Sequence, residues 1–274
     1  MTLEHLLSVW PKVAKQLRDA RHTLLLTDYD GTLTPIVERP ELANLPESTR
    51  LILETLAHRY DFTVGVISGR ALTDLKDKVS IHGIIYAGNH GLEIEGPGIS
   101  FVNPVAEELR PVLNTMHYVL SRALGTIRGA LVEHKGLTLS VHYRLVEEQK
   151  AKEVEGIVKR VVGTAQATGT AKITSGKKVY EVRPAVSWDK GKAIKLLMKR
   201  YSKVGGKSGP LPVYFGDDLT DEDGFKVIED YGSGISVFVG KENQHSAARY
   251  FLRSPAEVAA FLGMLLEQAR RGFK

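Results

Sequence analysis

The sequence predicts an α/β protein with a parallel, doubly wound sheet and an inserted unit of antiparallel sheet and helices. Toward both ends of the 274-residue chain, short apolar runs alternate with helical segments, which is typical of parallel sheets. These runs are continuously apolar, as expected of strands that are buried on both faces. In the middle of the chain the apolar residues alternate with polar ones at a period of two, which indicates a sheet with one open face.

The N-terminal part of the chain supplies the first elements of the parallel sheet. Apolar residues recur at helical spacing from Leu3 to Leu17 and predict a helix at the N-terminus. The runs "HTLLLTDYD", "FTVGVISGR" and "GIIYAGNHG" predict three buried strands. The segment "PESTRLILETLAHRY" predicts a helix between the first two strands, and a shorter helix is expected before the third. Strands that alternate with helices in this way favour parallel pairing.

The middle of the chain predicts an α+β insertion. The segment "GLEIEGPGISFV" predicts a hairpin with a Gly-Pro-Gly turn, and a helix is expected over about 106–124. The segment "ALVEHKGLTLSVHYR" alternates with a period of two and predicts a half-exposed antiparallel strand, with Leu139 and Ser140 on opposite faces. A long helix over about 147–166 and strands near "AKIT" and "KKVYEVRP" complete the insertion.

The alternating pattern of strands and helices returns at Trp188. The segment "WDKGKAIKLLMKRY" predicts a helix with Asp189 as its N-cap. The runs "PVYFGDDLTDEDGF" and "GISVFVG" predict two more buried strands, and "PAEVAAFLGMLLEQARR" predicts a closing helix. We therefore expect a core domain formed by residues 1–105 and 187–274, and an inserted domain formed by residues 106–186.

Composition excludes several classes of protein. The chain is 43% apolar and 25% charged, which is typical of a globular protein. It has no cysteine, so disulfides, thiolate zinc sites and a cysteine nucleophile are excluded, and a cytoplasmic location is expected. The basic residues behind the net charge of +5 are interspersed with acidic ones, so no nucleic-acid partner is expected. No run approaches the ~20 apolar residues of a membrane span, and the N-terminus lacks a signal-peptide pattern.

Carboxylates follow two of the predicted parallel strands. Asp28 and Asp30 follow the first strand in "TDYDGT", and Asp217 and Asp221 follow a distant one in "GDDLTD". The carboxyl ends of parallel strands lie at one edge of a sheet, where open α/β sheets bind ligands. Clustered carboxylates repel one another unless a cation lies between them, and oxygen ligands favour Mg²⁺. The sequence therefore predicts a Mg²⁺ site at this edge.

Two further residues add groups that bind anions. Ser68 follows the second strand, and Lys190 lies in the first turn of its predicted helix, near N–H groups that favour anions. Asp28 and Asp30 are two residues apart, so their side chains lie on one side of an extended segment. One carboxylate can then attack phosphorus while the other acts as general acid and base. Taken singly, these residues are typical of turns, caps or surface groups, but together they indicate phosphoryl transfer.

Four segments resemble the motifs of a known superfamily. "DYDGTL", "SGR", "DKGKA" and "GDDLTDED" are similar, in this order, to the four motifs of the haloacid dehalogenase superfamily of phosphotransferases. The insertion lies where that superfamily carries a type C2 cap. "GNHGLE", "VEHKGLTLSVHYR" and "VYEVRP" resemble segments of trehalose-6-phosphate phosphatases. The resemblance extends from about Thr23 to Phe261 and implies a Rossmann-like core with a substrate-specificity cap.

The resemblance implies a role for each candidate site residue. The catalytic residues that it implies are the nucleophile Asp28, the general acid/base Asp30, the phosphate-binding Ser68 and the motif-three lysine Lys190. The implied Mg²⁺ ligands are Asp28, the backbone carbonyl of Asp30, Asp217 and Asp221. The implied substrate-binding residues are Arg70, Asn89, His90, Gly91, Glu133, Lys135 and Glu181.

The resulting hypothesis is a Mg²⁺-dependent phosphatase. It would hydrolyse trehalose 6-phosphate through an aspartyl-phosphate, as the last step of trehalose biosynthesis, with no synthase domain on the same chain. Another sugar phosphatase with the same cap, acting on sucrose 6-phosphate or mannosyl-3-phosphoglycerate, is an alternative, and a phosphomannomutase is a further one. A catalytically silent sugar-phosphate sensor is disfavoured because every expected catalytic position is filled.

Overall fold

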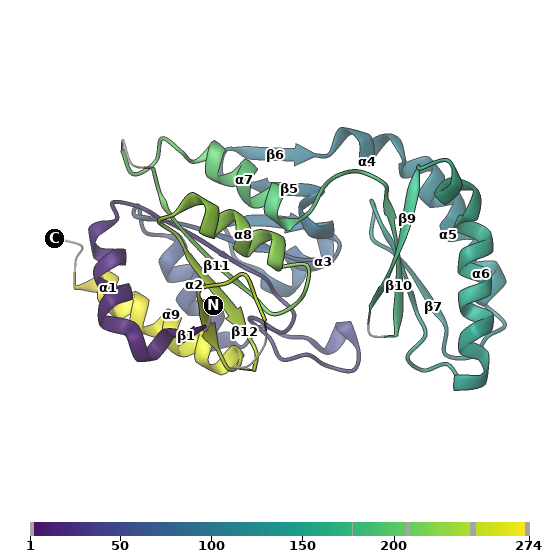
Figure 1. The fold of residues 1–274 in the computed structure, drawn as a ribbon, viewed down its shortest axis with the longest axis horizontal. Helices are drawn as coiled ribbons and strands as arrows, with labels where there is room; N and C mark the ends of the chain where they lie inside the picture. The colour runs from purple at the N-terminus through teal and green to yellow at the C-terminus, as the bar shows by residue number, and fades with distance from the viewer. Residues whose placement is uncertain (1–2, 177, 207–208, 242–244, 272–274) are drawn as a thin grey trace. The chain divides into compact units, whose positions relative to one another are not determined.

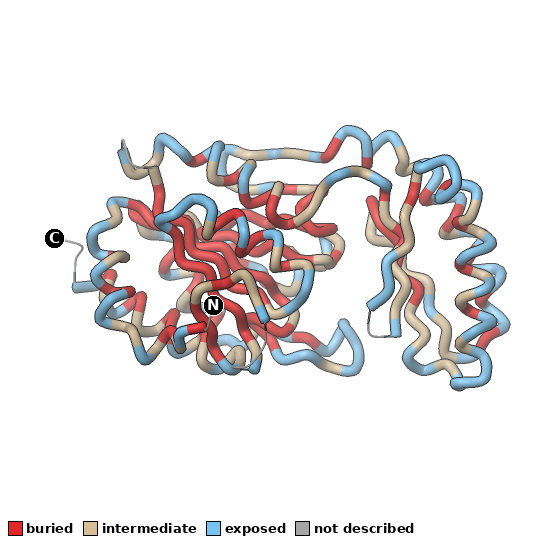
Figure 2. Tube along the Cα trace, viewed as in Figure 1, coloured by how far each residue is buried: buried red, intermediate tan, exposed pale blue. Residues whose placement is uncertain are grey.

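The chain folds into two compact units. The computed structural model describes residues 3–271 except 177, 207–208 and 242–244 (Figure 1). One unit comprises Met1–Phe101 with Trp188–Lys274, and the other comprises Val102–Ser187. Each unit has its own buried segments, coloured red in Figure 2. No helix within the described ranges combines the length and the apolarity that a membrane crossing requires.

The first unit is built on a mainly parallel sheet. Its strand order is β1-β13-β12-β11-β2-β3-β4-β5-β6, and the pairs from β1 to β4 in this order are parallel, whereas β4 and β5 are antiparallel. The strands are β1 (Glu4–His5), β2 (Thr23–Thr27), β3 (Phe62–Ile67), β4 (Ile85–Gly88), β5 (Glu93–Gly96), β6 (Ile99–Val102), β11 (Leu211–Gly216), β12 (Ile235–Val239) and β13 (Tyr250–Leu252).

Helices cover both faces of this sheet. The helices on one face are α1 (Trp10–Asp19), α2 (Glu47–Ala57), α3 (Leu72–Val79) and α9 (Pro255–Arg270), and those on the other are α7 (Lys190–Arg200) and α8 (Glu222–Tyr231). Leu25 of β2 packs with the first set, and Leu24 and Leu26 pack with the second, so this strand is buried on both sides. The predicted α/β fold class is confirmed.

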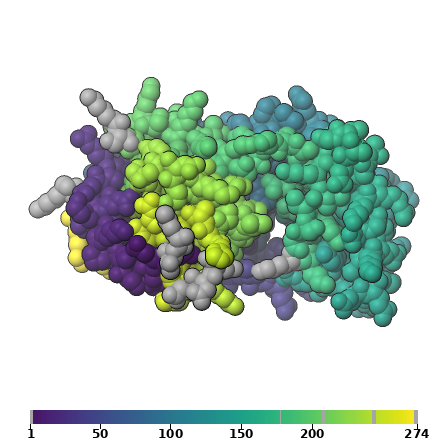
Figure 3. All heavy atoms as spheres, in the orientation of Figure 1, coloured from purple at the N-terminus to yellow at the C-terminus, as the bar shows by residue number. Residues whose placement is uncertain are grey.

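The two ends of the chain meet on one face of this unit. Trp10 of α1 contacts Phe261 of α9, with ring centroids 5.6 Å apart in an edge-to-face arrangement. Gln268 Nε2 donates a hydrogen bond of 2.8 Å to the carbonyl of Ala14. Figure 3 shows the purple N-terminal segment lying against the yellow C-terminal one. The N-terminal residues are therefore part of the core of this unit.

The strand order places the ends of β2 and β11 at a topological switch point. From β2 the chain proceeds to β3 and β4 on one side, whereas β11 proceeds to β12 and β13 on the other. Open α/β sheets bind ligands at the carboxyl ends of the strands that flank such a point. A ligand site is therefore expected at the residues that follow β2 and β11.

The second unit is an antiparallel sheet with helices on one face. Its strand order is β7-β8-β10-β9, and its elements are α4 (Pro104–Glu108), α5 (Arg110–Leu124), β7 (Leu131–His134), β8 (Leu139–His142), α6 (Glu148–Ala167), β9 (Ala171–Gly176) and β10 (Val179–Pro184). Leu139, Val141 and Val182 pack against Leu120 of α5 and Val158 of α6. The opposite face of the sheet carries polar side chains.

The predicted N-terminal helix begins later than its apolar spacing indicates. Glu4 and His5 form the edge strand β1, which pairs in parallel with Tyr250 and Phe251 of β13. The short 3₁₀ helix η1 (Leu6–Val9) follows, and α1 begins at Trp10 with Pro11 in its first turn. Proline lacks an N–H and fits an α-helix only in the first turn, so the helix could not begin at Leu3. Strand β13 was not predicted.

The single strand expected in "ALVEHKGLTLSVHYR" is wrong. The segment forms a hairpin of β7 and β8, closed by a hydrogen bond of 2.9 Å from Lys135 N to the carbonyl of Thr138. Gly136 has a φ of +83°, a conformation that glycine adopts without strain. The helix expected over 106–124 is likewise divided at Leu109, where α4 ends and α5 begins with Pro111 in its first turn. In both segments the apolar pattern continues across the break, so the pattern does not indicate where the element ends.

Candidate active site

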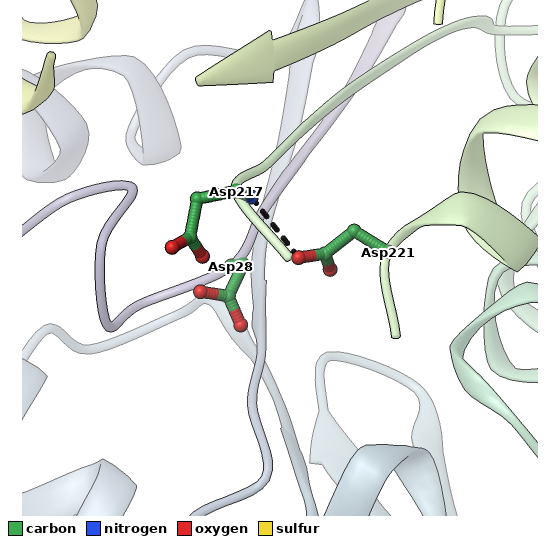
Figure 4. Close-up of side chains that lie close together, drawn as sticks. All are labelled: Asp28, Asp217 and Asp221. Carbon is green, nitrogen blue, oxygen red and sulfur yellow. Dashed lines mark hydrogen bonds between the residues drawn. The ribbon is translucent and has the colours of Figure 1, made fainter. Parts of the chain in front are cut away.

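Three aspartates meet at the switch point of the first unit. Asp28 directly follows β2, Asp217 directly follows β11, and Asp221 precedes α8. Each offers a carboxylate oxygen, and these oxygens lie within 4.8 Å of one another. Figure 4 shows the three side chains close together, with a dashed line for the hydrogen bond from Asp217 N to Asp221. The structure thus brings together residues that are more than 180 positions apart in the sequence, as the sequence analysis expects.

Lys190 is the buried cation of this cluster. Its Nζ donates hydrogen bonds of 2.7 Å to Asp28 Oδ1 and 2.7 Å to Asp221 Oδ1. Asp189 positions it, because the Asp189 carboxylate accepts a hydrogen bond from Lys192 N and caps α7 directly before Lys190. Burial by itself would lower the pKa of Lys190, but the carboxylates of Asp221 and Asp28 raise that pKa well above its usual range. Lys190 is therefore charged at neutral pH.

The cluster holds more negative charge than Lys190 neutralises. Three carboxylates and one ammonium group leave an excess of two negative charges when all four groups are ionised. Burial raises the pKa of Asp28 well above its usual range, although Lys190 opposes this shift. Burial and repulsion by Asp221 and Asp218 raise the pKa of Asp217 to about 7. The arrangement therefore favours a second cation.

The donor atoms of the cluster fit Mg²⁺. They are carboxylate oxygens, the hard ligands that Mg²⁺ prefers. Gly31 has a φ of +88°, and a Cβ at this position would lie 2.0 Å from Asp217 Oδ2. Only glycine therefore allows the Asp28–Gly31 loop to approach the Asp217 carboxylate so closely. The side chain of Asp30 is not part of this cluster.

Asp221 holds the other members of the cluster in place. Its Oδ2 accepts hydrogen bonds of 3.1 Å from Asp217 N and 3.2 Å from Asp218 N. Its Oδ1 accepts from Lys190 and from the hydroxyl of Tyr214 in β11. The residue is 0% exposed, so these bonds form away from solvent. Sequence reasoning missed Tyr214, because a tyrosine within an apolar strand gives no signal of a contact with a carboxylate seven residues later.

Asp30 is held by Arg70. The guanidinium donates from Nε to Asp30 Oδ2 and from Nη2 to Asp30 Oδ1, each at 2.7 Å. It also donates to Asp74 Oδ2 at 2.7 Å and to the carbonyl of Pro40 at 2.8 Å. Bidentate pairs of this kind fix a carboxylate in both position and orientation. The structure thus places Arg70, a predicted sugar ligand, in contact with the predicted general acid.

Ser68 lies in a loop that a left-handed turn supports. Its carbonyl accepts a hydrogen bond of 2.8 Å from His90 N, and the carbonyl of Arg70 accepts one of 2.7 Å from Asn89 N. Asn89, His90 and Gly91 have φ values of +50°, +58° and +85°. Left-handed conformations in non-glycine residues are costly and cluster at functional sites. Asn89 and His90 therefore hold the backbone of the Ser68 loop, and Gly91 continues the same left-handed turn.

The other predicted site residues meet in the second unit. Glu133 of β7 and Glu181 of β10 lie on either side of Lys135, whose Nζ is 3.9 Å from Glu133 Oε2 and 3.6 Å from Glu181 Oε1. His142 of β8, which the sequence analysis did not single out, pairs through Nε2 with Glu133 Oε2 at 2.9 Å. The structure therefore brings Glu133, Lys135 and Glu181 together on the polar face of this sheet.

Comparison with known proteins shows similarity along nearly the whole chain. Residues 26–256 match the model of the trehalose-phosphatase family. Trehalose 6-phosphate phosphatase RA3 of Zea mays is 36% identical over 258 residues, which cover 89% of this chain and 70% of the maize protein. Trehalose-phosphate phosphatase B of Arabidopsis thaliana is 35% identical over 260 residues, 92% of this chain and 68% of that protein. The solved C-terminal domain of trehalose-6-phosphate phosphatase from C. albicans matches with a TM-score of 0.80 and 25% identity, covering 97% of this chain and 98% of that one.

Proposed function

The chain belongs to the trehalose-phosphatase family, and from this premise we propose that it hydrolyses trehalose 6-phosphate to trehalose and phosphate, as the last step of trehalose biosynthesis. The observation that carries the proposal is the buried contact of Lys190 with Asp28 and Asp221 at the switch point of the sheet. Phosphoryl transfer of this kind uses a carboxylate that attacks phosphorus, a buried ammonium group and further carboxylate oxygens that hold a cation.

We propose that Mg²⁺ is held by Asp28, the backbone carbonyl of Asp30, Asp217 and Asp221. The oxygen donors and the excess negative charge of the cluster support this assignment. When bound, the ion would supply positive charge that offsets the repulsion between these carboxylates and a phosphate group. Lys190 contributes in the same sense, since its ammonium group lies 2.7 Å from the Asp28 carboxylate.

In the proposed reaction the Asp28 carboxylate attacks phosphorus. The bond between phosphorus and the sugar oxygen breaks, that oxygen takes a proton from Asp30, and an aspartyl-phosphate remains. Asp30 then removes a proton from water, and the resulting hydroxide attacks the aspartyl-phosphate to release phosphate and restore Asp28. Ser68 would donate its hydroxyl to the phosphate, and Arg70 would hold Asp30 in the orientation that both proton transfers need.

We propose that polar side chains of the second unit bind the sugar. In the second unit Glu133, Lys135 and Glu181 form a compact group of charged donors and acceptors. Groups of this kind discriminate among sugars, because a sugar that lacks the matching hydroxyl leaves a charge unpaired. In the first unit the proposed substrate-binding residues are Arg70, Asn89, His90 and Gly91.

The test is phosphate release from a panel of sugar phosphates. The panel contains trehalose 6-phosphate, sucrose 6-phosphate and mannosyl-3-phosphoglycerate, each assayed with Mg²⁺ and with EDTA. We expect fastest turnover of trehalose 6-phosphate with Mg²⁺ and little turnover with EDTA. Turnover of another member of the panel, with none of trehalose 6-phosphate, would refute the substrate assignment. An isomerised sugar phosphate as product would indicate a mutase instead.

A further inference from the structure

The polar face of the second unit contains a buried hydroxyl without a partner. Ser140 lies in β8 and is 0% exposed. Within the described part of the chain, its Oγ has no hydrogen-bond partner. Buried polar side chains are nearly always paired, because an unpaired one has lost its bonds to water without replacement. Packing within the sheet therefore does not by itself account for a serine at this position.

The strand register places Ser140 between two residues of the proposed sugar site. Ser140 lies directly opposite Glu133 of β7 on one side and Glu181 of β10 on the other. Directly opposed residues of neighbouring strands point to the same face, with Cβ atoms about 4.5–5.5 Å apart. Its sequence neighbours Leu139 and Val141 pack with the helices on the other face. The Ser140 hydroxyl therefore belongs to the same polar group as Glu133, Lys135 and Glu181.

This position favours a neutral hydroxyl as its ligand. The two residues that flank Ser140 across the sheet are carboxylates, which repel a phosphate and accept hydrogen bonds from hydroxyl groups. The ammonium group of Lys135 lies beside the same two carboxylates, 3.9 Å from Glu133 Oε2 and 3.6 Å from Glu181 Oε1, and offers a further donor to a bound hydroxyl. A serine hydroxyl both donates and accepts, and it can therefore pair with a sugar hydroxyl that also bonds a glutamate.

We infer that Ser140 is a specificity-determining residue that pairs with a hydroxyl of the substrate's sugar. The inference rests on the proposed hydrolysis of a sugar phosphate. The loss of stability from an unpaired buried hydroxyl is then offset when the sugar binds. If the serine only filled space in the strand, replacing it by alanine would leave the KM for the substrate unchanged.

The test compares Ser140→Ala and Ser140→Thr with the unmodified chain. The matched control is Thr174→Ala, because Thr174 lies opposite Glu181 on its other side and is exposed. We measure kcat and KM for the sugar phosphate that the unmodified chain hydrolyses fastest, and for p-nitrophenyl phosphate, which has no sugar. The melting temperature of each variant reports on folding.

We expect Ser140→Ala to raise KM for the sugar phosphate about threefold to tenfold, the effect of one hydrogen bond. Hydrolysis of p-nitrophenyl phosphate should be unchanged, and the melting temperature should be equal or higher because an unpaired hydroxyl is removed. Ser140→Thr retains the hydroxyl, so its KM for the sugar phosphate should be closer to that of the unmodified chain. Thr174→Ala should have the same KM as the unmodified chain.

Equal KM values for Ser140→Ala and the unmodified chain would overturn the inference. A parallel loss on both substrates, or a lower melting temperature, would assign Ser140 to folding and also overturn it. Absence of turnover of every sugar phosphate would do the same. If the fastest substrate is a sugar phosphate other than trehalose 6-phosphate, the proposed function fails, whereas the inference about Ser140 is tested on that substrate.

Discussion

Replacing Lys190 by methionine should destabilise the first unit strongly when no Mg²⁺ is present. Lys190 is 3% exposed and pairs with Asp28 and Asp221 at 2.7 Å each. Methionine fills a similar volume but carries no charge. The two carboxylates would then lie buried without their common cation, and they would repel each other. Such a change acts on the folded state, because in the unfolded chain water separates and solvates these groups.

The expected loss follows from the geometry of the cluster. Two unit charges at the 4.8 Å limit of this cluster repel by about 3.5 kcal/mol at an effective dielectric constant of about 20. Removing one partner of a buried ion pair costs about 3–5 kcal/mol in measured cases. We therefore expect the free energy of unfolding to fall by about 3–5 kcal/mol at pH 8 in EDTA. The loss should be smaller at pH 5, because protonation of either carboxylate removes the repulsion.

Urea unfolding followed by tryptophan fluorescence measures this loss. The chain has two tryptophans, Trp10 and Trp188, and both belong to the first unit. The matched control is Lys192→Met on the same helix. It also removes an ion pair, but an exposed one: the Lys192 side chain is 40% exposed, and its Nζ lies 3.8 Å from Asp189 Oδ2. That control should change the unfolding free energy by less than about 1 kcal/mol. Mg²⁺ should restore part of the loss in Lys190→Met, since a bound cation stabilises the folded state. A loss below about 1 kcal/mol in EDTA, or one equal to that of Lys192→Met, would refute the reasoning.

Three further predictions concern catalysis, the approach of two loops and pH. Asp28→Asn should lower kcat for phosphate release at least ~10³-fold, because the amide cannot attack phosphorus, and a rate within tenfold of the unmodified chain would contradict the covalent mechanism. Gly31→Ala should reduce Mg²⁺-dependent turnover more than tenfold, because its Cβ would lie 2.0 Å from Asp217 Oδ2. The control is Gly83→Ala: Gly83 also has a positive φ, of +76°, but a Cβ there would meet nothing within 4 Å, so turnover should be unchanged. Equal activities of these two variants would show that the close contact is unimportant. Burial lowers the pKa of His22, so the unfolded chain binds a proton at a higher pH than the folded one, and stability should fall as pH decreases below about 6.5. His22→Gln should flatten the melting temperature between pH 7 and pH 5, and an unchanged slope would show that His22 is not the group responsible.

Local patterns in the sequence predicted most elements of the fold. Continuous apolar runs mark strands such as β2, whose side chains are buried on both faces, and the cap at Asp189 marks the start of α7. The errors lie where the chain turns without interrupting its periodicity, as at Gly136, or where an edge strand is too short to show a period, as in Glu4–His5. Such short strands form because a neighbouring strand is available to pair with them, and a local pattern does not contain that information.

The sequence by itself determined which residue types follow the strands, and the rule that parallel strands end at one edge was sufficient to predict that Asp28, Asp217 and Asp221 converge. Only the tertiary structure decided which partner each side chain meets. It pairs Arg70 with Asp30, and it buries Ser140 between two glutamates of neighbouring strands. The physical reason is range: helix and strand periodicity act over a few residues, whereas hydrogen bonds, ion pairs and burial depend on distances in space that the whole fold sets.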